Sequence, residues 1–93
     1  MDIVMRYEME KMAGEELRFL AIKTRDYLNL TQKEMGKRLQ MSESSYSDIE
    51  TGRTICGMLT TILLLDMQDN PQEFLYRVRE KFALWYEKEM QTV

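Results

Sequence analysis

The chain has 93 residues, of which 44% are hydrophobic and 31% are charged. That length fits one domain with a single modest core, and the composition is that of a globular protein rather than a disordered or fibrous one. The net charge is −3 and histidine is absent, which excludes a strongly basic protein that coats nucleic acid without sequence preference.

Residues 1–16 form an acidic segment whose secondary structure the pattern leaves open. Apolar residues alternate from Ile3 to Met9 as in a strand, whereas Met5, Met9 and Met12 lie at helical spacing. The segment could be an arm, a strand paired with a second chain, or a helical extension. We treat it as an N-terminal arm or helical extension, separate from the domain that follows.

Two helices are predicted between Glu15 and Leu39. The first keeps its apolar residues at helical spacing as far as Leu28. The second begins after Thr31, because Glu34 three residues later can complete a capping box with it. We expect this second helix to end at about Leu39.

A third helix is predicted after a very short turn. Ser42 caps it, and Gly52 just past its end acts as a C-terminal stop. Because only Gln40 and Met41 separate it from the preceding helix, the two helices must cross at a steep angle. This spacing is that of the helix-turn-helix.

Two more helices complete a chain that we predict to be all-α. One is expected over residues 58–67. The other begins at Pro71, with Asn70 as its N-cap, and runs nearly to the C-terminus. The sequence therefore predicts five helices, with a helix-turn-helix domain at residues 17–70 and a long C-terminal helix at residues 71–93.

One stretch resembles the lambda-repressor and Cro-type helix-turn-helix family, often called the XRE family: LTQKEMGKRLQMSESSYSDIETG, residues 30–52. The similarity extends over roughly residues 17–68 and implies a lambda-repressor-like fold. Gly36 falls where only a small residue lets the second motif helix approach closely. The family pairs Glu50 with an arginine on the first helix, and Arg25 holds the matching position, so the resemblance implies a structural Arg25–Glu50 ion pair.

The same resemblance implies double-stranded DNA as the partner. In this family the glutamine at the start of the first motif helix holds a phosphate, which gives Gln32 that role, with Arg53 and nearby lysines as further phosphate contacts. The second motif helix is the recognition helix, which faces the bases. The residues implied to contact DNA are Gln32, Lys33, Ser42, Glu43, Ser44, Ser47, Asp48 and Arg53.

The predicted recognition helix carries acids and hydroxyls but no basic residue. A serine hydroxyl can donate to or accept from several bases, and a carboxylate such as that of Glu43 can accept from cytosine N4. Readout by these groups is chemically feasible but less discriminating than an arginine on guanine. Gln40 also departs from the family, which usually has glycine in this turn; a positive φ there is expected to cost ~1 kcal/mol.

The apolar surplus toward the C-terminus favours a homodimer. Residues 62–65 spread four aliphatic side chains around ~300° of a helix, more than one packed face can cover. The alternative is a small domain that wraps its own core with a long helix. A dimer suits the family, because two recognition helices ~34–36 Å apart match one turn of DNA. The expected interface residues are Leu64, Phe74, Val78, Phe82 and Trp85.

The residue inventory argues against an enzyme and for a cytoplasmic protein. Cys56 is the only cysteine, so no internal disulfide can form, and with no histidine we expect no catalytic residue, metal site or cofactor. The first eleven residues lack the features of a secretion signal. Apolar runs are far shorter than the ~20 residues that cross a bilayer, so no membrane partner is expected.

Two functions remain in view at this stage. The favoured one is a sequence-specific DNA-binding transcriptional regulator, a repressor, that binds a palindromic operator as a homodimer. The alternative is a protein-interaction module, antitoxin-like or an anti-regulator, whose fourth and fifth helices bind a partner protein while DNA binding is weak or absent.

Overall fold

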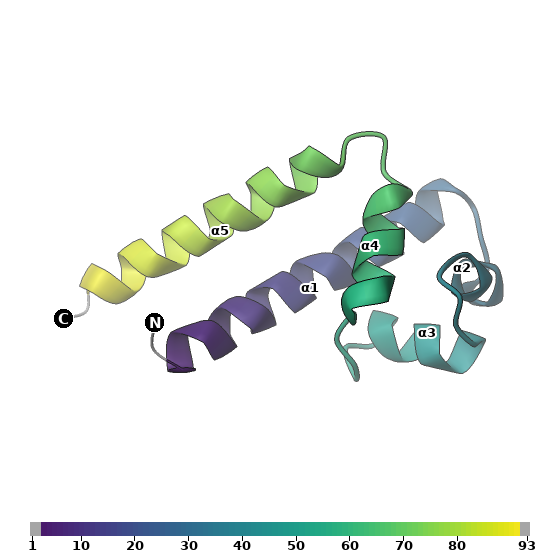
Figure 1. Ribbon diagram of the computed structural model, residues 1–93, viewed down its shortest axis with the longest axis horizontal. Coiled ribbons are helices and arrows are strands. Elements are labelled where there is room, and N and C mark those ends of the chain that lie inside the picture. The colour runs from purple at the N-terminus through teal and green to yellow at the C-terminus, as the bar shows by residue number, and fades with distance from the viewer. Residues whose placement is uncertain (1–2, 92–93) are drawn as a thin grey trace.

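The computed structural model describes residues 3–91, and this range contains five helices and no strand. The helices are α1 (Ile3–Tyr27), α2 (Gln32–Arg38), α3 (Glu43–Glu50), α4 (Met58–Asp66) and α5 (Pro71–Gln91). The long helices α1 and α5 run antiparallel to each other, and the three short helices gather beside the C-terminal half of α1 (Figure 1). The predicted all-α, five-helix fold is confirmed.

The helix α1 begins at Ile3 and continues without a break through the predicted first helix. Of the three alternatives for residues 1–16, the structure has the helical extension; the first two residues lie outside the described range. The buried residues of α1 start only at Leu17, whereas Ile3 at the other end is 84% exposed. The helix ends where Asn29 takes a φ of 56°, in the left-handed region. Within residues 3–91, no helix combines the length and apolar character needed to cross a membrane.

Both motif helices begin at the predicted caps. The Thr31 hydroxyl accepts a hydrogen bond from Glu34 N at 3.1 Å, and Thr31 N donates to Glu34 Oε1 at 2.9 Å, which completes the capping box. These two hydrogen bonds lower the pKa of the Glu34 carboxyl. At the start of α3, the Ser42 hydroxyl accepts from Ser45 N at 3.1 Å. The sequence therefore determines locally where both helices start.

The turn between α2 and α3 depends on close backbone packing at Gly36. A Cβ at this position would lie 3.0 Å from Met41 O and 3.2 Å from Ser42 O, both of them backbone atoms. The Gly36 carbonyl also accepts a hydrogen bond from Met41 N at 2.9 Å. Gln40 in the same turn has a φ of 60°, the positive value expected for a position where the family usually has glycine.

Replacing Gly36 with alanine is expected to destabilise the protein by about 1–3 kcal/mol, because the added methyl group would force the turn away from α2. Urea unfolding followed by circular dichroism measures the change. Gly57→Ala is the matched control, since a Cβ there meets nothing within 4 Å, and it should shift the free energy of unfolding by no more than about 0.5 kcal/mol. Equal effects of the two substitutions would contradict the role given to Gly36.

The core lies where all five helices meet, and it includes three residues that were expected at a dimer interface. Leu64, Phe74 and Val78 are only 0%, 7% and 8% exposed, and they pack inside the protomer with residues of α1. Because α5 folds back along α1, Phe74 and Val78 are buried within the chain itself, as is Leu64 from α4, and the predicted dimer interface stays a prediction. Phe82 packs against the same core and Trp85 is half-buried.

Candidate functional site

The outer face of α3 forms part of an open hollow on the surface of the protein. Its side chains come from the start of α2, from α3 and from the loop that follows α3. The residues that line it are Gln32, Glu43, Ser44, Ser47, Asp48 and Arg53. These are six of the eight residues that were predicted to contact DNA, brought together from positions up to 21 apart in the sequence (53 minus 32).

The other two predicted residues lie outside the lining of this hollow. Lys33 is exposed on α2, next to Gln32. The Ser42 hydroxyl is used in the cap of α3, since it accepts from Ser45 N and donates to Ser45 Oγ at 3.0 Å. The Ser42 hydroxyl therefore already makes two hydrogen bonds within the protein, and a contact with a base would have to form in addition to these or replace one of them.

Behind the hollow, the Glu50 carboxylate joins three helices. Arg25 donates from Nε to Oε2 at 2.6 Å and from Nη2 to Oε1 at 3.1 Å, so the structure contains the ion pair implied by the resemblance. Gln32 Nε2 donates to Oε1 at 3.0 Å, and the Tyr46 hydroxyl donates to Oε2. The Glu50 side chain is only 9% exposed. This network fixes the position of α3 relative to both α1 and α2.

The electrostatics of the network keep Glu50 ionised. Burial alone raises the pKa of its carboxyl, but the hydrogen bonds from Arg25, Tyr46 and Gln32 outweigh burial and hold the pKa below the ordinary value. The hydrogen bond to Glu50 raises the pKa of the Arg25 guanidinium. Burial, followed by the hydrogen bond to Glu50, raises the pKa of the Tyr46 hydroxyl. The pair is therefore charged over the whole neutral range.

Gln32 has a second role that sequence reasoning missed. Its side-chain amide donates one hydrogen to Glu50, which holds the group at the edge of the hollow. The amide keeps one further N–H and its carbonyl oxygen. The side chain can thus belong to the structural network and still donate to a group placed in the hollow.

Arg18 was not identified from the sequence, yet it holds the C-terminal end of α3. Its Nε donates to the Glu50 carbonyl oxygen at 2.8 Å. A positive charge at the C-terminal end of a helix also interacts favourably with the helix dipole. The Arg18 guanidinium lies 3.3 Å from Glu15 Oε1 and 5.3 Å from the centre of the Phe19 ring. The sequence contained a signal for this role of Arg18. Arg18 and Arg25 are seven residues apart, which is about two turns, so they lie on the same face of α1.

The loop after α3 presents Arg53 to solvent. Gly52 has a φ of 80°, and Arg53 N then donates to Asp48 O at 2.8 Å, which returns the chain toward α3. The Arg53 side chain is 80% exposed, and its Nη1 lies 4.0 Å from Asp48 Oδ1. A guanidinium this exposed is weakly held and free to contact an anion.

The chemistry of the hollow is that of a polar binding surface. It offers a guanidinium, two carboxylates, two hydroxyls and an amide as hydrogen-bonding groups. In the part of the chain that the structure describes, no group of three His, Cys, Asp or Glu side chains is arranged to hold a metal ion. Cys56 is half-buried, and burial raises the pKa of its thiol, which disfavours the reactive thiolate.

Comparison with protein families agrees with this geometry. The family model described as "Helix-turn-helix domain" matches residues 14–66, more than half of the chain. The match spans α2, α3, α4 and the half of α1 that packs against them, and it excludes the first turns of α1 and all of α5. No curated protein and no solved structure shows significant similarity to the chain.

Proposed function

Since the chain belongs to the helix-turn-helix family, whose members bind DNA, we propose that it is a sequence-specific transcriptional repressor. The observation that carries this proposal is the common hollow formed by Gln32, the outer residues of α3, and Arg53. Such a surface combines groups that can hold phosphates with groups that can read bases. In this arrangement α3 enters the major groove as the recognition helix.

The phosphate contacts would come from both ends of the hollow. At one end, Gln32 retains a free amide hydrogen, and Lys33 beside it is exposed. At the other end, Arg53 carries its exposed guanidinium. These groups would fix the orientation of α3 on the duplex without reading its sequence.

The base contacts would be made by acids and hydroxyls. Glu43 and Ser44 are exposed on the first turn of α3, and Ser47 and Asp48 lie one turn further along. A carboxylate facing a base edge can accept from cytosine N4, which makes cytosine the base that these positions favour. Because the carboxylates also repel phosphates, affinity for DNA of unrelated sequence should be low.

We propose that the repressor binds a palindromic operator as a homodimer, with the contact on α4 rather than through Phe74 and Val78 of α5, which are buried within the chain. Met58, Leu59 and Ile62 are 80%, 61% and 57% exposed on α4. Residues 54–65 contain no charged side chain, so this face can meet its own copy without charge repulsion. A two-fold contact is self-complementary and would place two copies of α3 for neighbouring half-sites.

Selection of bound duplexes from a random-sequence DNA pool, at about physiological salt, tests the proposal directly. The expected result is a palindromic consensus with half-sites one helical turn, ~34–36 Å, apart. On the selected operator, four to eight phosphate contacts per dimer should give a log–log slope of affinity against salt of about −4 to −7. Selected sequences that share a single half-site, with no second inverted copy one helical turn away, would contradict the dimer.

A second candidate function is a protein-interaction module, and the exposed apolar face of α4 is the observation that favours it. Met58, Leu59 and Ile62 could bind a partner protein as readily as a second copy. The same selection experiment separates the two functions. No enrichment from a folded sample would mean that the helix-turn-helix serves as a scaffold and that the partner is a protein.

A further inference from the structure

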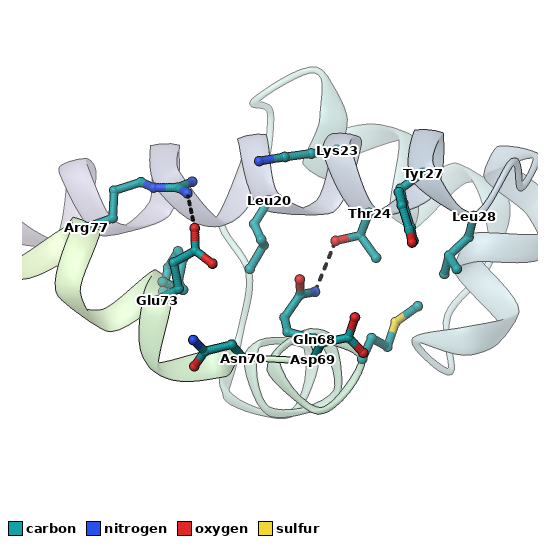
Figure 2. Close-up of a pocket in the computed structure, with 12 residues that line it drawn as sticks. Leu20, Lys23, Thr24, Tyr27, Leu28, Gln68, Asp69, Asn70, Glu73 and Arg77 are labelled. Atoms are coloured by element: carbon teal, nitrogen blue, oxygen red, sulfur yellow. Dashed lines mark hydrogen bonds and ion pairs between the residues drawn. The ribbon is translucent and has the colours of Figure 1, made fainter.

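A cavity of about 230 Å³ lies between the C-terminal half of α1, the segment that joins α4 to α5, and the first turns of α5 (Figure 2). It shares no residue with the hollow beside α3. Neither the proposed DNA contacts nor the α4 face uses its lining. The cavity is therefore a separate site, and its chemistry can be considered independently.

The lining of the cavity combines apolar and hydrogen-bonding side chains, and both kinds come from α1 and from the elements opposite it. Leu20 and Phe74, both buried, contribute apolar surface from α1 and α5. Gln68 Nε2 donates to Thr24 Oγ1 at 3.0 Å and to Leu64 O at 2.9 Å, and the first of these bonds crosses between the two walls (Figure 2). Within residues 3–91, Gln68 Oε1 accepts no hydrogen bond and remains available as an acceptor.

The rim of the cavity carries one unpaired cation and one unpaired acid. Glu73 and Arg77 bind each other across one helical turn at 3.5 Å, so their charges are matched. Lys23 on α1 and Asp69 on the opposite wall have no ion-pair partner among the residues that the structure describes (Figure 2). Both side chains are exposed, and a ligand that pairs with both carries an anionic group and a cationic group.

We propose that this cavity binds a free amino acid with an apolar side chain. The carboxylate would pair with Lys23, the ammonium group with Asp69 and Gln68 Oε1, and the side chain would pack against Leu20 and Phe74. The volume supports a ligand of this size, because it is below the ~300 Å³ at which pockets for larger ligands begin. The ligand carries both charged groups on one carbon, from which its apolar side chain branches, and this distinguishes it from a simple anion.

Isothermal titration calorimetry with the purified chain tests the proposal, using L-leucine, L-methionine and L-phenylalanine as probes. Two analogues of leucine remove one charge each: isocaproate lacks the ammonium group and isoamylamine lacks the carboxylate. At least one amino acid should bind, and each analogue should bind about tenfold more weakly than leucine, since each lost charged hydrogen bond removes ~1.5 kcal/mol or more.

Substitutions of the two charged residues proposed to bind the ligand test the same proposal from the side of the protein. Lys23→Gln and Asp69→Asn should each weaken binding about tenfold. Lys11→Gln on the same helix and Asp66→Asn at the end of α4 should leave it unchanged, because neither residue lines the cavity. Circular dichroism of every variant would establish that it is folded.

Two results would overturn the proposal. One is the absence of binding by all three amino acids at millimolar concentrations. The other is binding of isocaproate or isoamylamine as tight as that of leucine, which would exclude a zwitterion as the ligand class. No DNA is present in this experiment, so its outcome does not depend on whether the chain is a repressor.

Discussion

Arg25→Ala is expected to destabilise the protein by about 3 kcal/mol, the low end of the ~3–5 kcal/mol range for breaking a buried ion pair. The substitution leaves the Glu50 carboxylate, only 9% exposed, without its cation. The low end applies because Tyr46 and Gln32 still donate to Glu50. Urea unfolding at pH 7 measures the difference.

Two further variants test whether the destabilisation comes from leaving the buried Glu50 carboxylate unpaired rather than from removing an arginine charge in general. Arg6→Ala breaks the exposed pair with Glu10 and should cost no more than ~0.5 kcal/mol. A double variant with methionine in place of both Arg25 and Glu50 should recover much of the lost stability, because no charge is then buried alone. A loss below about 1 kcal/mol in Arg25→Ala would contradict the structural role of the pair.

The same network predicts a specific dependence of stability on pH. The pKa of the Glu50 carboxyl is lower in the folded protein than its ordinary value of 4.5, so folding favours the ionised form. The resulting stabilisation is complete above pH 4.5 and is lost as the pH falls through the folded pKa. Glu50→Gln should lack this component, so the difference in stability between wild type and variant should shrink on acidification.

Arg53→Ala is expected to weaken operator binding by about 100-fold. Each copy of a dimer would lose one charged phosphate contact of ~1.5 kcal/mol, and two copies together give ~3 kcal/mol. The slope of log affinity against log salt should become shallower by about 2, one for each lost contact. Fluorescence anisotropy with a labelled operator duplex measures both quantities.

The control for this prediction is Arg79→Ala, which removes an exposed arginine of α5 far along the chain from the hollow. It should leave affinity and salt dependence nearly unchanged. Because the Arg53 side chain is 80% exposed, its removal should change the free energy of unfolding by less than about 0.5 kcal/mol. Unchanged affinity in Arg53→Ala would remove Arg53 from the DNA contact and favour the protein-interaction module.

The parts of the fold that were predicted correctly depend on short-range signals. Thr31 and Ser42 cap α2 and α3 through residues three positions away, and Gly52 ends α3 with its own positive φ. Such features are set by neighbouring residues, so a single sequence contains them. The membership of the helix-turn-helix family followed from the same local pattern.

The contacts that the sequence did not predict lie between distant parts of the chain. Phe74 and Val78 lie at helical spacing, but the spacing does not say whether α1 or a second copy covers them. Gln32 and Glu50 are 18 residues apart and Arg18 and Glu50 are 32 apart, so their hydrogen bonds depend on how the helices cross. The first turns of α1 show the same limit, since their pattern fitted a strand as well as a helix.

The division of α3 into two faces has a consequence for how this protein can diversify. Tyr46, Ile49 and Glu50 point inward and support the fold, whereas the outer residues Glu43 and Ser44 make no side-chain hydrogen bond within residues 3–91. Mutations on the outer face can therefore accumulate with little loss of stability. If the outer face reads bases as proposed, a lineage of such proteins could acquire new target sequences one substitution at a time, without passing through unfolded intermediates.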